Sequence, residues 1–353
     1  WSFDSLFIEC EKCGHPHHVL SFYKKLRKDA SWHVGGHAFV ALLKASKSLH
    51  DVESGIELHE KTLKIGILRK NVFVGCTLVD FYVKCGMLTK AQDVLEDLPI
   101  RDVASWNALM AGHVEKGNSE ETLLCFRYMQ EEDLAPNDVS YVCALKSCCI
   151  MKDMDFGRGL HLEIVKKGLE REIFVHNTLI DMYAKFGLFV DAIGVFDKLP
   201  LVRDEISWNA LLSGYVEHGY GKEALKCFEK MQLSGISPND VTYMGCLKAC
   251  GTIGTTPNGV EIHAKLIKGD LIRKDIVLGT ALVDMYAKCC DLAKAQKVLK
   301  DLHVRDIVSW NALIAGYIQV GQSHEALNCV SQMQREGLPP DEVTFACILK
   351  ACG

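Results

Sequence analysis

The sequence has few prolines and no long apolar run, and both features limit the classes of protein to which the chain can belong. Eight prolines in 353 residues, with no tract rich in serine and glycine, give no sign of a flexible linker between domains. No apolar stretch reaches the roughly 18 residues expected of a membrane-spanning helix. The net charge of −5 shows no overall excess of positive charge, which nucleic-acid-binding domains often carry. With 48% hydrophobic residues, the chain is rich enough in apolar side chains to build a core.

Complete enzyme and metal motifs are missing too. His161-Leu162-Glu163 matches the first part of a zinc deaminase motif, but no Cys-x-x-Cys segment follows it. Cys10 and Cys13 have the spacing of zinc ligands, yet Cys13 falls at a position that recurs along the chain. No phosphate-binding loop and no Gly-x-Ser-x-Gly segment is present. We therefore expect no catalytic residue, no metal site and no cofactor, and we do not expect an enzyme.

What the sequence does contain is a long-range repeat. The segment Ser-Trp-Asn-Ala-Leu at 105–109 returns at 207–211 and 309–313, a step of 102 residues each time (207 − 105 and 309 − 207). Leu-Lys-Ala or Leu-Lys-Ser segments begin, at the same step, at Leu43, Leu145, Leu247 and Leu349. Asp-x-Tyr segments occur at 80–82, at 181–183 and at 284–286, for Asp-Phe-Tyr, Asp-Met-Tyr and Asp-Met-Tyr. Such spacing indicates stacked structural repeats.

Aligning these three segments as the first helix of each repeat divides the chain into short units. Their lengths cycle as 35, then 35 or 36, then 31 or 32 residues. The prediction is a single repeat array over 1–353, with repeats 1–35, 36–71, 72–102, 103–137, 138–172, 173–204, 205–239, 240–275, 276–306 and 307–341 and a partial repeat 342–353.

Each repeat carries two helical patterns separated by a turn. In repeat 205–239 we expect a first helix over about 205–217, a break at 218–221 and a second helix over 222–233. The apolar stripe of the second helix consists of Ala224, Leu225, Phe228 and Met231. Two helices alone cannot cover such stripes, but stacked neighbours can, so the sequence predicts an all-α solenoid with one concave face.

The sixteen cysteines fall mostly at recurring positions inside the helical patterns. Cys148, Cys250 and Cys352, for example, are again 102 residues apart. We interpret them as small buried thiols at helix contacts in a reducing compartment, rather than as the disulfide framework of a secreted protein.

The residues of these motifs and the cycle of repeat lengths together resemble the pentatricopeptide repeat (PPR) family. The resemblance is to the plant subclass (PLS), whose three repeat variants alternate in length. The resemblance rests on Val-Ser-Trp-Asn-Ala-Leu-Ile-Ala-Gly-Tyr (308–317), Thr-Phe-Ala-Cys-Ile-Leu-Lys-Ala-Cys-Gly (344–353) and Ala-Leu-Val-Asp-Met-Tyr-Ala-Lys-Cys (281–289), and it covers the whole chain. The tetratricopeptide repeat, with a uniform period of about 34 residues, fits less well. The resemblance implies a right-handed superhelix of helix-turn-helix repeats that binds single-stranded RNA, one nucleotide per repeat.

The resemblance also implies which residues contact the RNA. The fifth residue of the first helix and the last residue of the repeat are expected to read the base. These pairs are Cys76/Asp102, Asn107/Asn137, Asn177/Asp204, Asn209/Asn239, Thr280/Asp306 and Asn311/Asp341. An amide offers a donor and an acceptor to the edge of a base, whereas the fifth residues Val40, Val142 and Met244 of every third repeat offer neither. The alternative is that the asparagines only start helices, because asparagine favours N-caps.

Two further sets lie on the same helix face. The second residues Phe73, Phe174, Ile206, Val277 and Val308 are expected to stack on bases, with packing between repeats as the alternative. The lysines at the ninth or thirteenth position are expected to contact phosphates, with a solvated surface row as the alternative: Lys84, Lys146, Lys185, Lys248 and Lys288.

For function, the resemblance implies the specificity module of a mitochondrial or chloroplast factor for C-to-U editing of RNA. The expected partners are single-stranded RNA and an editing accessory protein or deaminase, and no membrane. Because position 1 is not Met and no transit peptide is recognisable, we expect a fragment, with any deaminase beyond Gly353 or on a partner. The alternatives are a scaffold that binds proteins within a ribonucleoprotein, and RNA stabilisation or splicing rather than editing.

Overall fold

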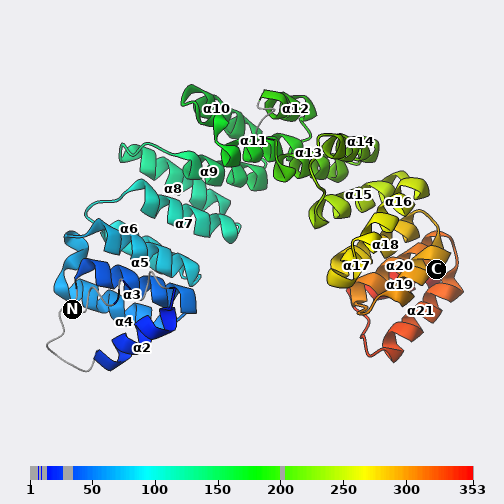
Figure 1. Ribbon diagram of the computed structural model, residues 1–353, viewed down its shortest axis with the longest axis horizontal. Coiled ribbons are helices and arrows are strands. Elements are labelled where there is room, and N and C mark those ends of the chain that lie inside the picture. The colour runs from blue at the N-terminus through cyan, green and yellow to red at the C-terminus, as the bar shows by residue number, and fades with distance from the viewer. Residues whose placement is uncertain (1–6, 8, 10–13, 27–34, 199–202, 353) are drawn as a thin grey trace. The chain divides into compact units, whose positions relative to one another are not determined.

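The computed structural model describes the chain apart from residues 1–6, 8, 10–13, 27–34, 199–202 and 353. Every regular element in the described ranges is a helix (Figure 1). The prediction of an all-α solenoid of helical repeats is thereby confirmed. In the described part, no helix is both long and apolar enough to cross a membrane. Cys10 and Cys13 lie outside the described residues.

The chain divides into two compact units, Trp1–Thr178 and Leu179–Gly353, and the division falls inside α11 (Ile173–Lys185). The first unit holds α2 (Pro16–Leu26), α3 (Gly36–Leu49), α4 (Val52–Ile65), η1 (Ile67–Arg69), α5 (Val72–Lys84), α6 (Leu88–Asp97), α7 (Val103–Glu115), α8 (Ser119–Glu131), α9 (Asp138–Met151), α10 (Met154–Lys166) and η2 (Leu169–Arg171).

The second unit continues the same alternation of first and second helices. It holds α12 (Phe189–Lys198), α13 (Glu205–Glu217), α14 (Gly221–Leu233), α15 (Asp240–Ile253), α16 (Thr256–Lys268), α17 (Leu271–Lys274), α18 (Ile276–Lys288), α19 (Leu292–Asp301), α20 (Ile307–Gln319), α21 (Ser323–Arg335) and α22 (Glu342–Cys352). Within each unit, neighbouring first helices pack on each other, as α5 does on α7 and α18 on α20.

The second helix explains why repeat lengths cycle. In the repeats that carry the Trp-Asn motif, the second helices α8, α14 and α21 are 13 residues long. In the shortest repeats, the second helices α6, α12 and α19 have only 10 residues. The third type adds a short element, η1, η2 or α17, after its second helix. A repeat of about 31 residues has therefore lost roughly one helical turn of 3.6 residues from its second helix.

In repeat 205–239, the helix boundaries can be compared with those predicted from local sequence signals. The first helix, α13, occupies Glu205–Glu217, as predicted, and the apolar stripe of α14 is buried. The second helix begins at Gly221, which the sequence placed in the break. A Cβ atom on Gly221 would lie 2.9 Å from the carbonyl oxygen of Ala249 on α15. Glycine is needed there because the two backbones approach closely, not because the helix ends.

In two of the three Trp-Asn repeats, a hydrogen bond from the tryptophan ties the two helices of the repeat together, whereas the buried Trp208 indole nitrogen has no hydrogen-bond partner among the described residues. Trp106, Trp208 and Trp310 are all buried. The Trp106 indole donates to Glu132 over 2.9 Å and the Trp310 indole to Glu336 over 3.2 Å. Each glutamate is the C-cap of the second helix in its repeat. Burying a large apolar side chain stabilises a fold by about 1.5–3 kcal/mol, so the motif closes the hairpin.

The recurring cysteines lie inside these helix contacts. Cys148 and Cys250 are fully buried, and no disulfide joins any cysteine that the structure describes. Burial raises the pKa of each of these two thiols to about 12, so both are protonated at neutral pH. They act as small apolar residues of the core, as their recurrence predicted; the Cys352 side chain lies outside the description.

Candidate nucleic-acid interface

The last residue of a repeat is the N-cap of the next repeat's first helix. Its Oδ1 accepts the backbone N–H three residues later, over 3.2 Å from Ser140 to Asn137 and 2.7 Å from Ser309 to Asp306. The residues that cap in this way are Asp102, Asn137, Asp204, Asn239, Asp306 and Asp341. Capping uses one side-chain atom and leaves the second, Oδ2 or Nδ2, for another partner.

The fifth residue of a repeat bonds to that cap. Asn107 donates through Nδ2 to Oδ1 of Asn137 over 2.9 Å. The corresponding donor–acceptor distances are 3.1 Å for Asn209 to Asn239, 2.9 Å for Asn311 to Asp341, 3.5 Å for Thr280 to Asp306 and 3.2 Å for the Cys76 thiol to Asp102. Five pairs that were predicted from residues 26 or 30 positions apart are therefore in direct contact.

The two members of the sixth pair, Asn177 and Asp204, belong to different compact units. Asn177 is a buried residue of α11, and Asp204 caps α13. The alternative in which asparagines such as Asn107 merely start a helix does not hold. Asn107 is the fifth residue of α7, and Asp102 is its cap.

A third side chain, which the sequence reasoning missed, completes the amide pairs. The hydroxyls of Ser140, Thr242 and Thr344 donate to Oδ1 of Asn107, Asn209 and Asn311, over 2.7 Å in each case. These hydroxyl residues are fully buried at the third position of the following repeat. The sequence does show a Ser or Thr three residues after each cap. A capping box alone explains that spacing, so the spacing did not point to a contact with the amide of the preceding repeat.

The charge state of these pairs follows from their hydrogen bonds. Burial would raise the pKa of the Asp102 carboxyl, but bonds from the Ser105 backbone and the Cys76 thiol bring it below its ordinary value. The N–H of Thr344 lowers the pKa of Asp341 in the same way. Burial and the nearby Asp102 carboxylate raise the pKa of Cys76 to about 12. At neutral pH, the Asp102 and Asp341 carboxylates are therefore acceptors, and Cys76 is a donor.

The second residues of the first helices stand out from the surface. Phe73 is 75% exposed and Phe174 is 68% exposed, while Ile206, Val277 and Val308 are about half exposed or more. About half or more of each side chain is therefore left for a ligand, while the buried remainder is compatible with packing between repeats. Positions two and five lie one helical turn apart, so each exposed apolar side chain neighbours a base-reading candidate.

The fifth residues of the remaining repeats carry no polar group. Val40, Val142 and Met244 are half-buried on α3, α9 and α15. Without a donor or an acceptor they cannot discriminate between bases by hydrogen bonding, as expected from their side chains.

The five lysines predicted to meet phosphates are all exposed: Lys84, Lys146, Lys185, Lys248 and Lys288. Two of them are engaged within their own helix. Lys185 pairs with Asp181, and Lys288 pairs with Asp284, each over 2.7 Å. Exposed pairs of this kind contribute only about 0–1 kcal/mol, so both lysines can exchange partners, but the aspartates reduce the local positive charge.

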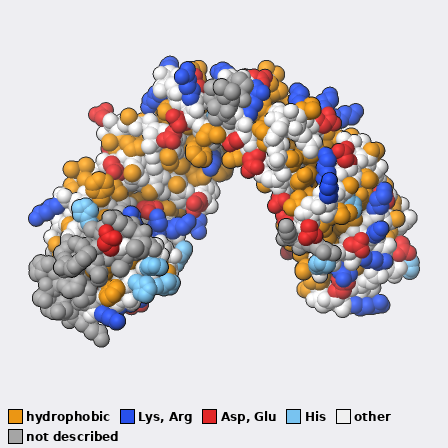
Figure 2. All heavy atoms as spheres, in the orientation of Figure 1, with side chains coloured by type: hydrophobic (Ala, Val, Ile, Leu, Met, Phe, Trp, Pro, Cys, Tyr) orange, Lys and Arg blue, Asp and Glu red, His pale blue; other side chains and the backbone are white. Residues whose placement is uncertain are grey.

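Lys146 and Lys248 occupy the ninth position and have no ion pair among the residues that the structure describes. They follow apolar fifth residues, four positions earlier on the same face. Elsewhere the charges are mixed: Figure 2 shows basic and acidic side chains interspersed over the visible face. Among the five predicted lysines, a positive stripe therefore depends mainly on Lys84, Lys146 and Lys248, for which the structure describes no ion pair.

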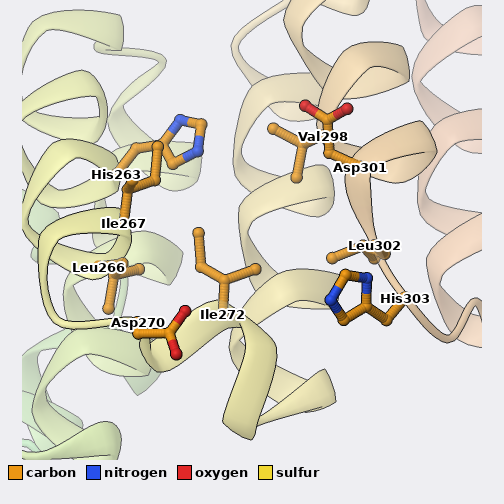
Figure 3. Close-up of a pocket in the computed structure, with 9 residues that line it drawn as sticks. All are labelled: His263, Leu266, Ile267, Asp270, Ile272, Val298, Asp301, Leu302 and His303. Atoms are coloured by element: carbon orange, nitrogen blue, oxygen red, sulfur yellow. The ribbon is translucent and has the colours of Figure 1, made fainter.

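A cavity of about 480 Å³ in the second unit lies apart from these residues. Figure 3 shows His263 and Asp301 at one end and Asp270 and His303 at the other, with Leu266, Ile267, Ile272, Val298 and Leu302 among its lining. These residues come from α16, α17, α19 and the segments that follow them, not from first helices. Among the described residues, no cluster of His, Cys, Asp or Glu is arranged to hold a metal ion.

Comparison with known proteins places this geometry in a family. A model of the PPR repeat family matches residues 101–150, 203–252 and 305–353, and a PPR repeat model matches 174–200. Two relatives from Arabidopsis thaliana are each 34% identical: the chloroplastic pentatricopeptide repeat-containing protein At4g18520, over 314 residues, and the mitochondrial At3g09040, over 312. The alignments cover 89% and 88% of this chain but only 50% and 30% of those proteins, so the chain spans half or less of their length.

Solved structures show the same fold. A crystal structure of PPR10 in complex with an 18-nucleotide psaJ RNA element superimposes with a TM-score of 0.76. At 16% identity, the match covers 99% of this chain and 57% of PPR10. Repeat lengths, hairpin geometry and family models agree, and the chain belongs to the pentatricopeptide repeat family.

Proposed function

We propose that this chain binds single-stranded RNA and that each hydrogen-bonded pair of fifth and last residues faces one base. The observation that carries the proposal is the recurrence of one arrangement. A polar pair held by a helix cap lies next to an exposed apolar side chain, as at Asn209, Asn239 and Ile206. Stacking on an apolar side chain combined with an edge-reading polar group is how proteins recognise unpaired bases. The RNA bound to PPR10 in its crystal structure supports the same class of ligand.

The atoms left free in each pair suggest its base. In Asn107/Asn137, both Oδ1 atoms are occupied within the protein, so the pair offers N–H donors only. Cytosine presents two acceptors, N3 and O2, whereas uracil presents an N3–H donor that would find no acceptor. In Asn311/Asp341, Oδ2 of the carboxylate remains available to accept that N3–H. The first pair is therefore assigned to a pyrimidine, with cytidine favoured by its donors, and the second to uridine.

Thr280 and Asp306 differ because the reader is a hydroxyl. Guanine presents two donors, N1–H and the N2 amino group, which a carboxylate and a hydroxyl oxygen can accept. With repeats read from the N-terminus against RNA running 5′ to 3′, repeats 103–137 to 307–341 are assigned the run 5′-Y-n-U-C-n-G-U-3′. The n positions face Val142 and Met244.

The test is selection of RNA from a random single-stranded library by the purified chain. We expect enrichment of the run above, binding without added metal, and unchanged cytidines in the bound RNA. Recovery of RNA without any preferred run would refute base reading by these pairs. If the chain captured no RNA but bound a ribonucleoprotein subunit, the scaffold alternative would replace the proposal.

We place this activity in a chloroplast or mitochondrion, in line with the names of the relatives, and assign it to the selection of a cytidine for C-to-U editing. The length cycle of the repeats supports the editing assignment, through the resemblance to the PLS subclass. Sequencing organelle transcripts from plants without the gene checks it. Loss of one C-to-U change beside the preferred run is expected, whereas intact editing with a less abundant or unspliced transcript would indicate stabilisation or splicing.

A further inference from the structure

A buried hydroxyl from the following repeat touches each amide reader of the Trp-Asn repeats. We propose that Ser140, Thr242 and Thr344 are positioning residues that fix which side of the Asn107, Asn209 and Asn311 amides faces the base. The inference rests on the proposed RNA-binding function and adds a third residue to each reading pair.

The direction of each hydroxyl bond is determined by its surroundings. The Oγ1 of Thr242 accepts the backbone N–H of Asn239 over 3.2 Å, so it has one proton left to donate. Its two acceptors within reach are Oδ1 of Asn209 at 2.7 Å and Oδ1 of Asn239 at 2.9 Å. If the proton pointed only at Asn239, two oxygens would face each other over 2.7 Å without a proton between them. The hydroxyl therefore donates to Asn209.

This bond decides the orientation of the amide. An asparagine side chain can rotate by half a turn and exchange its oxygen and nitrogen at little steric cost. In the observed orientation, Nδ2 of Asn209 donates to Oδ1 of Asn239 while its own Oδ1 accepts from Thr242. Rotation would place Oδ1 against the cap oxygen, and the free N–H that is assigned to the base would be lost. The same geometry recurs at Ser140 and Thr344.

The equivalent hydroxyl beside Thr280 does something else. Ser309 donates to the backbone carbonyl of its own cap, Asp306, over 2.8 Å and accepts the N–H of Asp306 over 3.1 Å. No hydrogen bond joins it to Thr280, whose one described bond goes to Asp306. Ser309 thus has the capping role without the positioning role, which makes it the matched control.

The experiment compares variants Thr242→Val, Thr242→Ser and Ser309→Ala with the parent chain. Titrations use RNAs that differ only in having C or U opposite Asn209, with helicity and melting recorded for each variant. Thr242→Val should reduce the C:U affinity ratio at that base by about two- to tenfold, the range expected for losing one neutral hydrogen bond. Thr242→Ser should keep the ratio. Ser309→Ala is read at the base opposite Thr280, where it should leave the G:U affinity ratio unchanged although it weakens a similar cap.

The outcomes separate this inference from the proposed function. A folded Thr242→Val variant with the parental ratio would overturn the positioning role while leaving base reading intact. A parent chain that does not distinguish C from U opposite Asn209 would overturn the donor-only assignment of its pair, and the inference with it. If Thr242→Val does not fold, Ser140→Ala, read at the base opposite Asn107, decides in the same way, since a loss of capping alone does not change a ratio of affinities.

Discussion

The hydroxyl of Thr280 lies 3.5 Å from Oδ1 of Asp306, the longest of the five pair contacts that the structure describes. The amide of Asn311 reaches its cap Asp341 over 2.9 Å. A distance of 3.5 Å is at the outer limit of a hydrogen bond, so the Thr280 hydroxyl makes only a weak hydrogen bond within the protein. Its oxygen remains able to accept from a base, and guanine presents two donors on one edge, N1–H and the N2 amino group.

The first prediction changes this pair. Thr280→Asn should shift the preference at the facing nucleotide from G towards U, because an amide/carboxylate pair then stands where Asn311/Asp341 has one. A base contact is worth about 1–3 kcal/mol, so the G:U affinity ratio should change by roughly tenfold or more. Titrations of two RNAs that differ only at that base measure it. Thr280→Ser is the control and should keep the preference for G; an unchanged ratio in Thr280→Asn would mean that Thr280 does not face the base.

Helix boundaries were accessible to sequence reasoning because their signals are local. The 205–217 helix has its cap, Asp204, and its terminating segment within a few residues, and the structure places α13 there. Gly221 was misassigned because the reason for a glycine, the approach of Ala249, lies 28 residues further on (249 − 221). Local glycine rules cannot detect a contact with the next repeat.

In the candidate interface too, contacts between residues close in sequence could be predicted, whereas contacts between residues far apart in sequence could not. The pairing of Lys288 with Asp284 is an ordinary contact between residues four apart, and its neutralising effect was open to prediction from the sequence. The contact of Thr242 with Asn209 was not, because it joins residues 33 positions apart through the stacking of two repeats. Only the relative placement of neighbouring first helices brings that hydroxyl to the amide.

The second prediction concerns the lysines that are proposed to contact phosphates. Lys248 has no ion pair among the described residues, whereas Lys288 pairs with Asp284 over 2.7 Å. Lys248→Gln should therefore weaken RNA binding more than Lys288→Gln. The slope of log affinity against log salt should fall in magnitude by about 0.7 for each phosphate that is no longer neutralised. Affinities measured from low to physiological salt test both points, and equal effects of the two changes, or a parent affinity that ignores salt, would contradict the predicted role.

The third prediction concerns the exposed second residues. Phe174→Ala should reduce affinity for single-stranded RNA by about 1–3 kcal/mol, since stacking on an aromatic ring is removed. Stability should change little, because the ring is 68% exposed and packs only lightly against the rest of the chain. The matched control is Val190→Ala, which removes an 87% exposed apolar side chain from the second helix α12. Filter binding and thermal melting distinguish the two; equal affinities for both variants would exclude Phe174 from the interface.

The fourth prediction uses the cap Asp102, whose pKa lies below its ordinary value of about 3.9 in the folded chain. The folded state then binds fewer protons than the unfolded state near that pH. The stabilisation by the carboxylate is therefore complete above about pH 4 and is lost as the pH falls through the folded pKa. Asp102→Asn keeps a capping oxygen but cannot ionise, so it should cost about 0.3–1 kcal/mol at pH 7, from the lost charge at the helix N-terminus, and nothing at pH 2.

Melting temperatures of the parent chain and Asp102→Asn between pH 7 and pH 2 provide the measurement, with the two curves expected to converge in acid. The control is Asn239→Ala, which removes an uncharged cap. Its deficit should be about 0.5–2 kcal/mol and should not depend on the ionisation of the cap, since no proton binds there. Curves for Asp102→Asn that stay parallel to the parent down to pH 2 would show that Asp102 has no lowered pKa, and that its Cys76 and Ser105 bonds do not favour the carboxylate over the acid.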